Sequence, residues 1–197
     1  MTPDTTDELS ALDSKLWDVR ERASKTLFAK GSDAIDLLVA GVSHRRPRVR
    51  AGCVALLDHL ADDRCHAALL AALHDTSPLV RRHAVHAIGC QQCKASPLRI
   101  DVTGALIDRM TNDPSPRVRR VAAHQLGLQP YDSRALTALA QVASERRDPG
   151  LLSRARHALA EQQRRALRPA VQQEPEPAAP PGSLETHDSL PAMGGLG

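Results

Sequence analysis

Apolar residues recur along this chain with the period of an α-helix, and the whole pattern returns five times. Each copy is anchored on a Val or Leu, and the positions four and eight residues later fall on the same helical stripe. The residue at +4 is always small, and the residue at +8 is always aliphatic. Each copy therefore predicts a helix that a neighbouring helix can approach closely. The anchors are Val19, Val49, Val80, Val118 and Leu151, followed at +4 by Ala23, Cys53, Ala84, Ala122 and Ala155 and at +8 by Leu27, Leu57, Ile88, Leu126 and Leu159.

Prolines indicate where these helices begin. Proline stands two residues before the anchor in four copies, and its missing N–H costs nothing in the first turn of a helix. A serine or aspartate precedes three of these prolines and is a good N-cap. Gly89 and Gly127 are expected to act as C-caps. The prolines are Pro47, Pro78, Pro116 and Pro149, and the predicted N-caps are Ser77, Ser115 and Asp148.

A shorter amphipathic helix precedes each of these helices, so every copy predicts a helical hairpin. One hairpin cannot bury both of its faces, and stacking of successive hairpins supplies the core. The sequence therefore predicts an all-α fold, an α-solenoid of about five helical hairpins. The preceding helices are expected around Asp7–Leu12 and over Ala34–Ser43, Arg64–His74, Val102–Thr111 and Ser133–Ser144.

Charge divides the chain into three parts. Residues 1–13 form an acidic N-terminal segment with a frayed first helix, and residues 14–168 form the solenoid. Residues 169–197 are rich in Pro, Ala and Glu and are expected to be disordered. This tail has four acidic residues and no Lys or Arg, so its net charge is −4, whereas the whole chain has +3. The solenoid is therefore basic.

Composition excludes several classes of protein. Aromatic residues make up 2% of the chain, so the core must be aliphatic. The chain has no apolar run long enough for a membrane span and no signal-like start. Four cysteines are too few for a disulfide scaffold, and a cytoplasmic location is the expectation.

The third and fourth copies share a motif. Asp75-Thr-Ser-Pro-Leu-Val-Arg-Arg-His-Ala84 returns as Asp113-Pro-Ser-Pro-Arg-Val-Arg-Arg-Val-Ala122. This motif resembles the short HEAT-like repeat first associated with phycobilin lyases, and the resemblance covers roughly Leu16 to Ala160. It implies an α-solenoid. The family includes lyases, scaffolds and uncharacterised bacterial proteins, so the resemblance does not fix an activity.

An arginine follows the anchor in four copies, and we call this column the arginine ladder: Arg20, Arg50, Arg81 and Arg119. One interpretation is a stripe that binds anions. In HEAT-like repeats, however, this arginine typically bonds to carboxylates and carbonyls of the turns, and Asp75 and Asp113 occupy the matching turn position. We therefore favour a structural role.

A second set of basic residues stands two and six positions after the anchor. These positions are i and i+4 on the helix face opposite the buried stripe. By resemblance, the second helices of HEAT-like repeats line a concave surface, so this set predicts a groove for a partner. The alternative is an ordinary solvated face. We call the set the basic row: Arg82, His86, Arg120, His124 and His157.

The spacing between Val80 and Val118 is longer than the others, and the extra residues include Cys90-Gln-Gln-Cys93. Cys90 and Cys93 fit a metal clip or a redox pair, and His83 and His86 stand upstream. The alternative is a loop with two free thiols. We favour the loop and expect neither a metal nor a cofactor.

No catalytic motif of the common enzyme classes occurs, so we expect a binding protein rather than an enzyme. The leading hypothesis is a protein interaction scaffold that binds an acidic segment along the concave face. The alternative is binding to a nucleic-acid backbone. A small lyase or modifying enzyme is the second alternative, with His86, His124 and His157 as its only candidates. The arginines considered for phosphate binding are Arg45, Arg46, Arg48, Arg82, Arg117 and Arg120.

Overall fold

The computed structural model describes residues 5–60, 62–90, 98, 100–145 and 148–167, and these residues form helices and turns without a strand. Contacts divide the chain into two units, Met1–Leu167 and Arg168–Gly197, and the described residues all belong to the first. The expected disordered tail lies outside the described residues. The helices are α1 (Thr5–Ala11), α2 (Trp17–Ala29), α3 (Ile35–Gly41), α4 (Pro47–Leu60), α5 (His66–Ala72), α6 (Pro78–Gly89), α7 (Val102–Asn112), α8 (Pro116–Leu128), α9 (Ser133–Ser144) and α10 (Pro149–Ala166).

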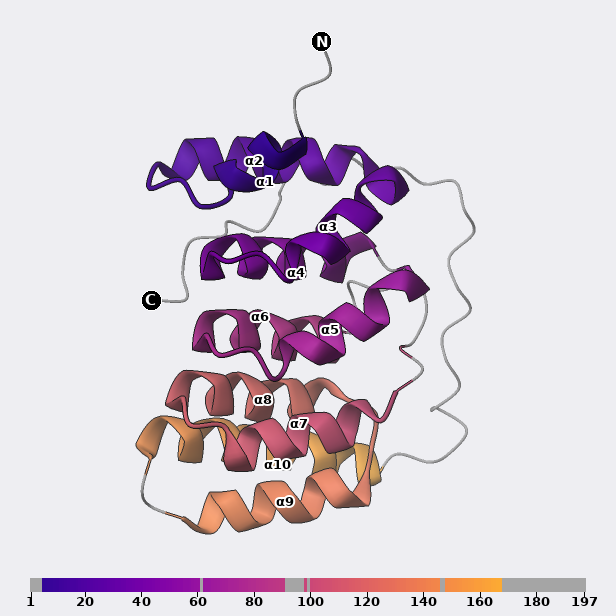
Figure 1. The fold of residues 1–197 in the computed structure, drawn as a ribbon. Coiled ribbons are helices and arrows are strands. Elements are labelled where there is room, and N and C mark those ends of the chain that lie inside the picture. The colour runs from indigo at the N-terminus through magenta and orange to yellow at the C-terminus, as the bar shows by residue number, and fades with distance from the viewer. Residues whose placement is uncertain (1–4, 61, 91–97, 99, 146–147, 168–197) are drawn as a thin grey trace. The chain divides into compact units, whose positions relative to one another are not determined.

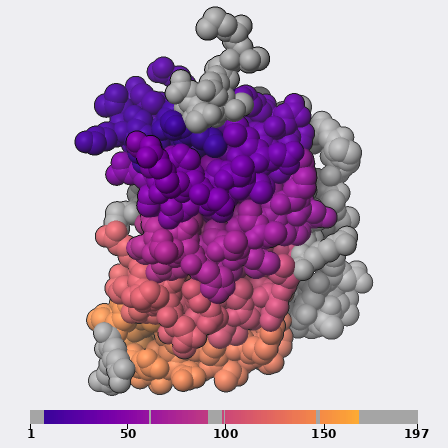
Figure 2. Space-filling model, viewed as in Figure 1, coloured from indigo at the N-terminus to yellow at the C-terminus, as the bar shows by residue number. Residues whose placement is uncertain are grey.

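These helices pair into successive hairpins, as the sequence predicts (Figure 1). The second helices pack on one another in order, α2 on α4, α4 on α6, α6 on α8 and α8 on α10. Figure 2 shows the repeats as consecutive bands of colour, which is the arrangement expected when each repeat contacts mainly its neighbours. The predicted α-solenoid is confirmed.

The repeated stripe forms the core. The residues at +4 are buried, and Ala84, Ala122 and Cys53 are fully enclosed. Burial raises the pKa of the Cys53 thiol to about 12, so this cysteine is a protonated core residue. The three aromatic residues, Trp17, Phe28 and Tyr131, are all exposed. The core is therefore aliphatic, as the composition predicts.

The starts of the helices agree only in part with the expectations. Proline is the first residue of α4, α6, α8 and α10, as predicted. The Asp148 side chain accepts a hydrogen bond from the Leu151 N–H and caps α10. The side chains of Ser77 and Ser115 make no capping bond. Instead, the carboxylates of Asp75 and Asp113 accept from the N–H groups of these serines.

Two further expectations are wrong. Gly31 is the described glycine with a positive φ, so Gly89 and Gly127 are not left-handed C-caps. They lie inside helices where a side chain would collide with the next repeat: a Cβ on Gly127 would lie 2.9 Å from Ala158 Cα. Their role is close packing. The helices α3 and α5 are also shorter than predicted, because the 3-10 turns Gly31–Ala34 and Asp63–Cys65 precede them.

Within the described ranges, each helix is too short or too polar to span a bilayer.

Candidate partner-binding face

The basic row lies on three successive second helices. Arg82 and His86 are on α6, Arg120 and His124 on α8, and His157 on α10. The side chains of Arg120, His86 and His157 are 42%, 50% and 68% exposed. Arg82 and His124 are half-buried. The row is therefore accessible to a partner along α6, α8 and α10.

The packing of these helices brings the three histidines within electrostatic reach of one another. Burial lowers the pKa of His124, and the positive charges of Arg154, His157 and His86 lower it further. Arg154 precedes His157 by one turn of α10 and shares its face. It therefore extends the basic row, although the repeat pattern did not single it out.

Arg82 also lies in positive surroundings. Burial lowers the pKa of its guanidinium, and Arg117 lowers it further. Burial, with Arg82 and His86, lowers the pKa of His83 to about 4. Each of these shifts includes repulsion between like charges, which the arrival of an anionic group would reduce.

Arg120 forms an ion pair with the next repeat. Its Nη2 donates to Asp148 Oδ1 at 2.9 Å, across the start of α10. Its guanidinium also covers Gly150, where a Cβ would lie 2.5 Å from Arg120 Nε. Arg120 is thus both an exposed cation and part of the contact between α8 and α10.

The arginine ladder lies between the repeats. Arg50 donates from Nε and Nη2 to the two carboxylate oxygens of Asp75, both at 2.7 Å. Arg81 pairs with Asp113 in the same way, at 2.7 and 2.9 Å. These hydrogen bonds raise the pKa of both arginines. Bidentate pairs of this kind are the strong ones.

The same arginines also hold the turn before their own helix, so the bonds continue from one repeat to the next. Arg81 Nη1 donates to the Asp75 carbonyl at 2.8 Å, and Arg119 Nη1 donates to the Asp113 carbonyl at 2.9 Å. The carboxylate of each aspartate therefore accepts hydrogen bonds from the arginine of the preceding repeat. Its backbone carbonyl accepts a hydrogen bond from the arginine of its own repeat.

The ladder changes at its N-terminal end. Arg20 donates to the carbonyls of Ser14 and Lys15 at 2.7 and 3.1 Å. In the next repeat, the position that matches Asp75 and Asp113 is occupied by His44. The first rung therefore holds its own turn, without the aspartate that the later rungs use.

The family model for HEAT repeats matches residues 7–89 and 66–160. The chain belongs to the HEAT-repeat family. No curated protein matches this HEAT-repeat chain.

Three solved structures with a similar fold are distant from this chain in sequence. The complex of CpcE and CpcF of phycocyanin lyase from Nostoc sp. PCC7120 has a TM-score of 0.64 at 18% identity, covering 78% of this chain and 96% of that one. A designed armadillo repeat protein in complex with the peptide (KR)4 has a TM-score of 0.54 at 17% identity, covering 80% and 81%. A computationally designed armadillo protein for modular peptide recognition gives 0.51 at 15% identity, covering 86% and 91%. These similarities show the fold alone.

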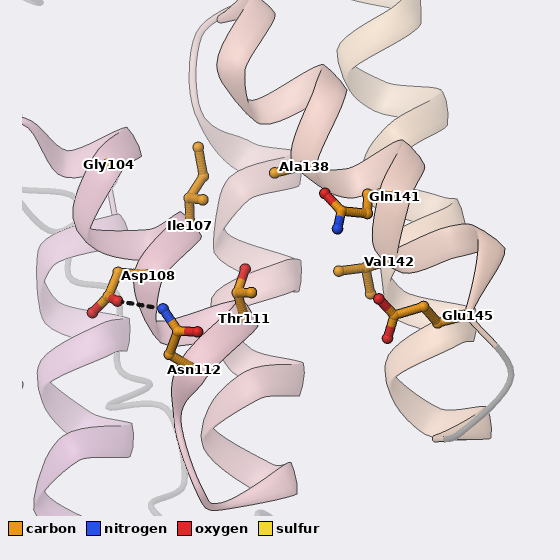
Figure 3. A pocket seen from close by; sticks show the side chains of 9 residues that line it. All are labelled: Gly104, Ile107, Asp108, Thr111, Asn112, Ala138, Gln141, Val142 and Glu145. Carbon is orange, nitrogen blue, oxygen red and sulfur yellow. Dashed lines mark hydrogen bonds between the residues drawn. The ribbon is translucent and has the colours of Figure 1, made fainter.

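A cavity of about 400 Å³ lies elsewhere in this HEAT-repeat chain, between α7 and α9 (Figure 3). The carboxylates of Asp108 and Glu145 line it, together with polar groups of Asn112 and Gln141. Asn112 Nδ2 donates to Asp108 Oδ1 at 2.8 Å. No member of the basic row lines this cavity, and its acidic lining is unlike the row.

The repeat pattern did not identify one further residue of the face. Asp58 is a buried acid of α4, 1% exposed, and its Oδ2 lies 3.6 Å from His86 Nε2. The half-buried Cys90 follows α6 directly, and its Sγ lies in the same cluster, whereas Cys93 lies outside the described residues. A signal existed, because Asp58 occupies the position nine residues after its anchor where later repeats have Gly89 and Gly127.

Proposed function

We propose that this HEAT-repeat protein is a binding scaffold whose basic row receives an acidic segment of a partner protein. The observation that carries the proposal is the convergence of His86, His124 and His157 with Arg154 on neighbouring second helices. An acidic segment lying across these helices would meet cations from three repeats. Such complementarity gives both specificity and fast association.

The similar designed armadillo protein supports the use of this fold to bind a peptide. The charge expected of the peptide follows from the basic row itself. That protein is in complex with (KR)4, a basic peptide. The face proposed here is itself basic, so the expected segment has the opposite charge.

The alternative of nucleic-acid binding is less favoured because acids neutralise part of the basic surface. Arg46 pairs with Asp13, Arg120 pairs with Asp148, and Lys25 pairs with Glu21. Arg46 and Arg120, which were considered for phosphate contacts, are therefore already in ion pairs.

The test uses a labelled oligoglutamate peptide as the probe, with (KR)4 and a single-stranded oligonucleotide as comparisons. Fluorescence anisotropy should show binding of oligoglutamate and not of (KR)4. Replacing Arg82 and Arg154 together by Gln should weaken binding roughly tenfold, about 1.4 kcal/mol. The matched control is Arg64→Gln with Arg134→Gln, which removes two exposed arginines outside the second helices, one in the 3-10 turn before α5 and one in α9.

The comparison probes and the control variant distinguish binding of an acidic segment from binding of a nucleic acid. Equal weakening by both double variants would contradict a specific face. Tighter binding of the oligonucleotide, with a steep dependence on salt, would favour the nucleic-acid alternative. The tail has four acids of its own, so the same titration is repeated after replacing Glu174, Glu176, Glu185 and Asp188 by their amides. Tighter binding by this variant would show that the tail competes for the row.

A further inference from the structure

Three side chains of metal-binding types meet beside the basic row. Asp58 belongs to α4, His86 to α6, and Cys90 is the residue that ends α6. One ligand atom from each residue lies within 4.8 Å of the other two. Zinc binds sulfur, nitrogen and oxygen at roughly 2.0–2.3 Å, so small side-chain rotations that draw these atoms together would let a single ion contact all three.

Local helix geometry explains two of the three ligands. His86 and Cys90 are four residues apart, so they lie above one another on the same side of α6. The Cys90 N–H donates to the His86 carbonyl at 2.9 Å, which keeps this last turn closed. The sequence alone does not bring the third ligand here. Asp58 comes from the preceding repeat, through the packing of α4 on α6.

Gln125 provides the support that a histidine ligand requires. Its Nε2 lies 3.0 Å from His86 Nδ1, and its Oε1 is buried without a hydrogen-bond partner. Rotating this amide by half a turn exchanges its oxygen and nitrogen, which ordinary structure determination does not distinguish. The oxygen would then accept a hydrogen bond from the His86 Nδ1–H, which leaves the lone pair of His86 Nε2, on the Asp58 side, for a metal. Such outer partners orient metal-binding histidines.

We propose that Asp58, His86 and Cys90 bind a zinc ion that joins the second and third repeats. Thiolate, imidazole and carboxylate together suit Zn²⁺ better than Mg²⁺ or Ca²⁺, which prefer oxygen ligands. Binding replaces the Cys90 thiol proton, so one proton is released for each ion bound. His86 binds the ion through Nε2, so its ring proton is on Nδ1. Three protein ligands leave a fourth position for water or for a group of a partner.

This site goes beyond the proposed scaffold function and does not depend on it. His86 belongs both to the basic row and to the zinc site, whereas Asp58 and Cys90 belong to the zinc site alone. Loss of zinc binding with intact oligoglutamate binding would overturn only the zinc proposal. Loss of oligoglutamate binding with intact zinc binding would overturn only the scaffold proposal.

The experiment uses the full chain, reduced and stripped with a chelator, and then titrated with Zn²⁺ or Co²⁺. We expect one equivalent of Zn²⁺ with submicromolar Kd in competition with a chromophoric chelator, and a higher melting temperature with metal. Co²⁺ should give the absorption band of a cobalt–thiolate bond. The titration is carried out in the Cys93→Ser background, where the band should persist and adding Cys90→Ser should abolish it.

The variants separate this site from adventitious binding. His86→Gln and Asp58→Asn should each weaken Zn²⁺ binding at least tenfold, and Gln125→Met by about tenfold, the scale seen for outer partners. His157→Gln, an exposed histidine of the same row, is the matched control and should leave Kd unchanged. If Asp58→Asn fails to fold, the half-buried Cys90 still provides the test. An unchanged Kd in Cys90→Ser, or the absence of a thiolate band, would overturn the proposal.

Discussion

Arg81 and Arg82 are neighbours in α6, yet their surroundings are opposite. Arg81 is 7% exposed and forms a bidentate pair with Asp113 of the next repeat. Arg82 lies near Arg117, and burial together with that like charge lowers its pKa, whereas the bond to Asp113 raises the pKa of Arg81. One residue along a helix turns a side chain by about 100°. That rotation separates the contact between repeats from the exposed face.

The difference shows how a HEAT-repeat chain can separate stability from recognition. The arginine ladder has the same residue type in four repeats, because each arginine holds the turn before its own helix, and Arg50 and Arg81 also bind the next repeat. The basic row is confined to the later repeats. The matching positions in the first two repeats hold Glu21, Lys25, Ala51 and Ala55. A face that varies on a constant frame can acquire a partner without rebuilding the stack.

The largest expected effect comes from breaking the ladder. Arg81→Ala should lower the free energy of unfolding by about 3–5 kcal/mol, because it leaves the buried Asp113 carboxylate without its guanidinium. Arg82→Ala should cost about 1 kcal/mol, the usual scale of a point substitution. Urea denaturation followed by circular dichroism measures both. Equal losses would contradict the division between ladder and row.

The enclosed small residue at +4 in α8 should also be sensitive to added side-chain volume. Ala122→Leu should cost about 1–3 kcal/mol, because Ala122 is fully enclosed and added atoms must displace its neighbours. Ala140→Leu, the same substitution at an exposed site on α9, is the control and should be nearly neutral. Thermal melting of the two variants provides the comparison. A stable Ala122→Leu protein would mean that this column does not mediate close contact.

Much of the fold could be predicted because each repeat provides an independent reading of the same pattern. Proline at one register fixed the starts of four helices, and the small +4 column correctly indicated burial. The glycines were misinterpreted because a helix end and a close approach favour the same residue. Gly127 is helical, and only its distance from Ala158 reveals its role.

The candidate site was less predictable because its contacts cross repeats. The +2 and +6 columns are four residues apart and therefore lie on one face of each helix. Nothing in them indicated that Arg120 pairs with Asp148, because the other N-cap positions hold the neutral residues Ser77 and Ser115. Nor did the columns indicate the approach of Asp58 to His86, since it depends on how α4 packs against α6.

Acid should weaken the arginine ladder, at a lower pH than the one at which the basic row responds. Burial opposes ionisation of Asp113, but Arg81 and the Ser115 N–H outweigh it and lower its pKa. A lowered carboxylate pKa contributes stability above about pH 4 that is lost as the pH falls through the folded-state value. Between about pH 5 and pH 2, the double variant Arg81→Met with Asp113→Leu should therefore lose less of its free energy of unfolding than the parent does. Urea denaturation at each pH measures this, and parallel curves would contradict the role of the pair.

The smallest expected effect is on the affinity of the basic row for oligoglutamate. It comes from protonation of a histidine rather than of a carboxylate. Burial, with Arg154, His157 and His86, lowers the pKa of His124, so this histidine is largely neutral at pH 7. Glutamate side chains of a bound peptide would favour its protonated form and raise that pKa. Binding of oligoglutamate should therefore strengthen roughly two- to fivefold as the pH falls from about 7.5 to 6, where the peptide stays ionised. Anisotropy titrations in chelator keep metal away from His86. His124→Gln should flatten this dependence, whereas Arg82→Gln with Arg154→Gln should weaken binding at every pH and retain a slope. If the affinity of the wild-type protein did not change with pH, His124 would not contact the peptide. Only the arginines of the face would then bind it.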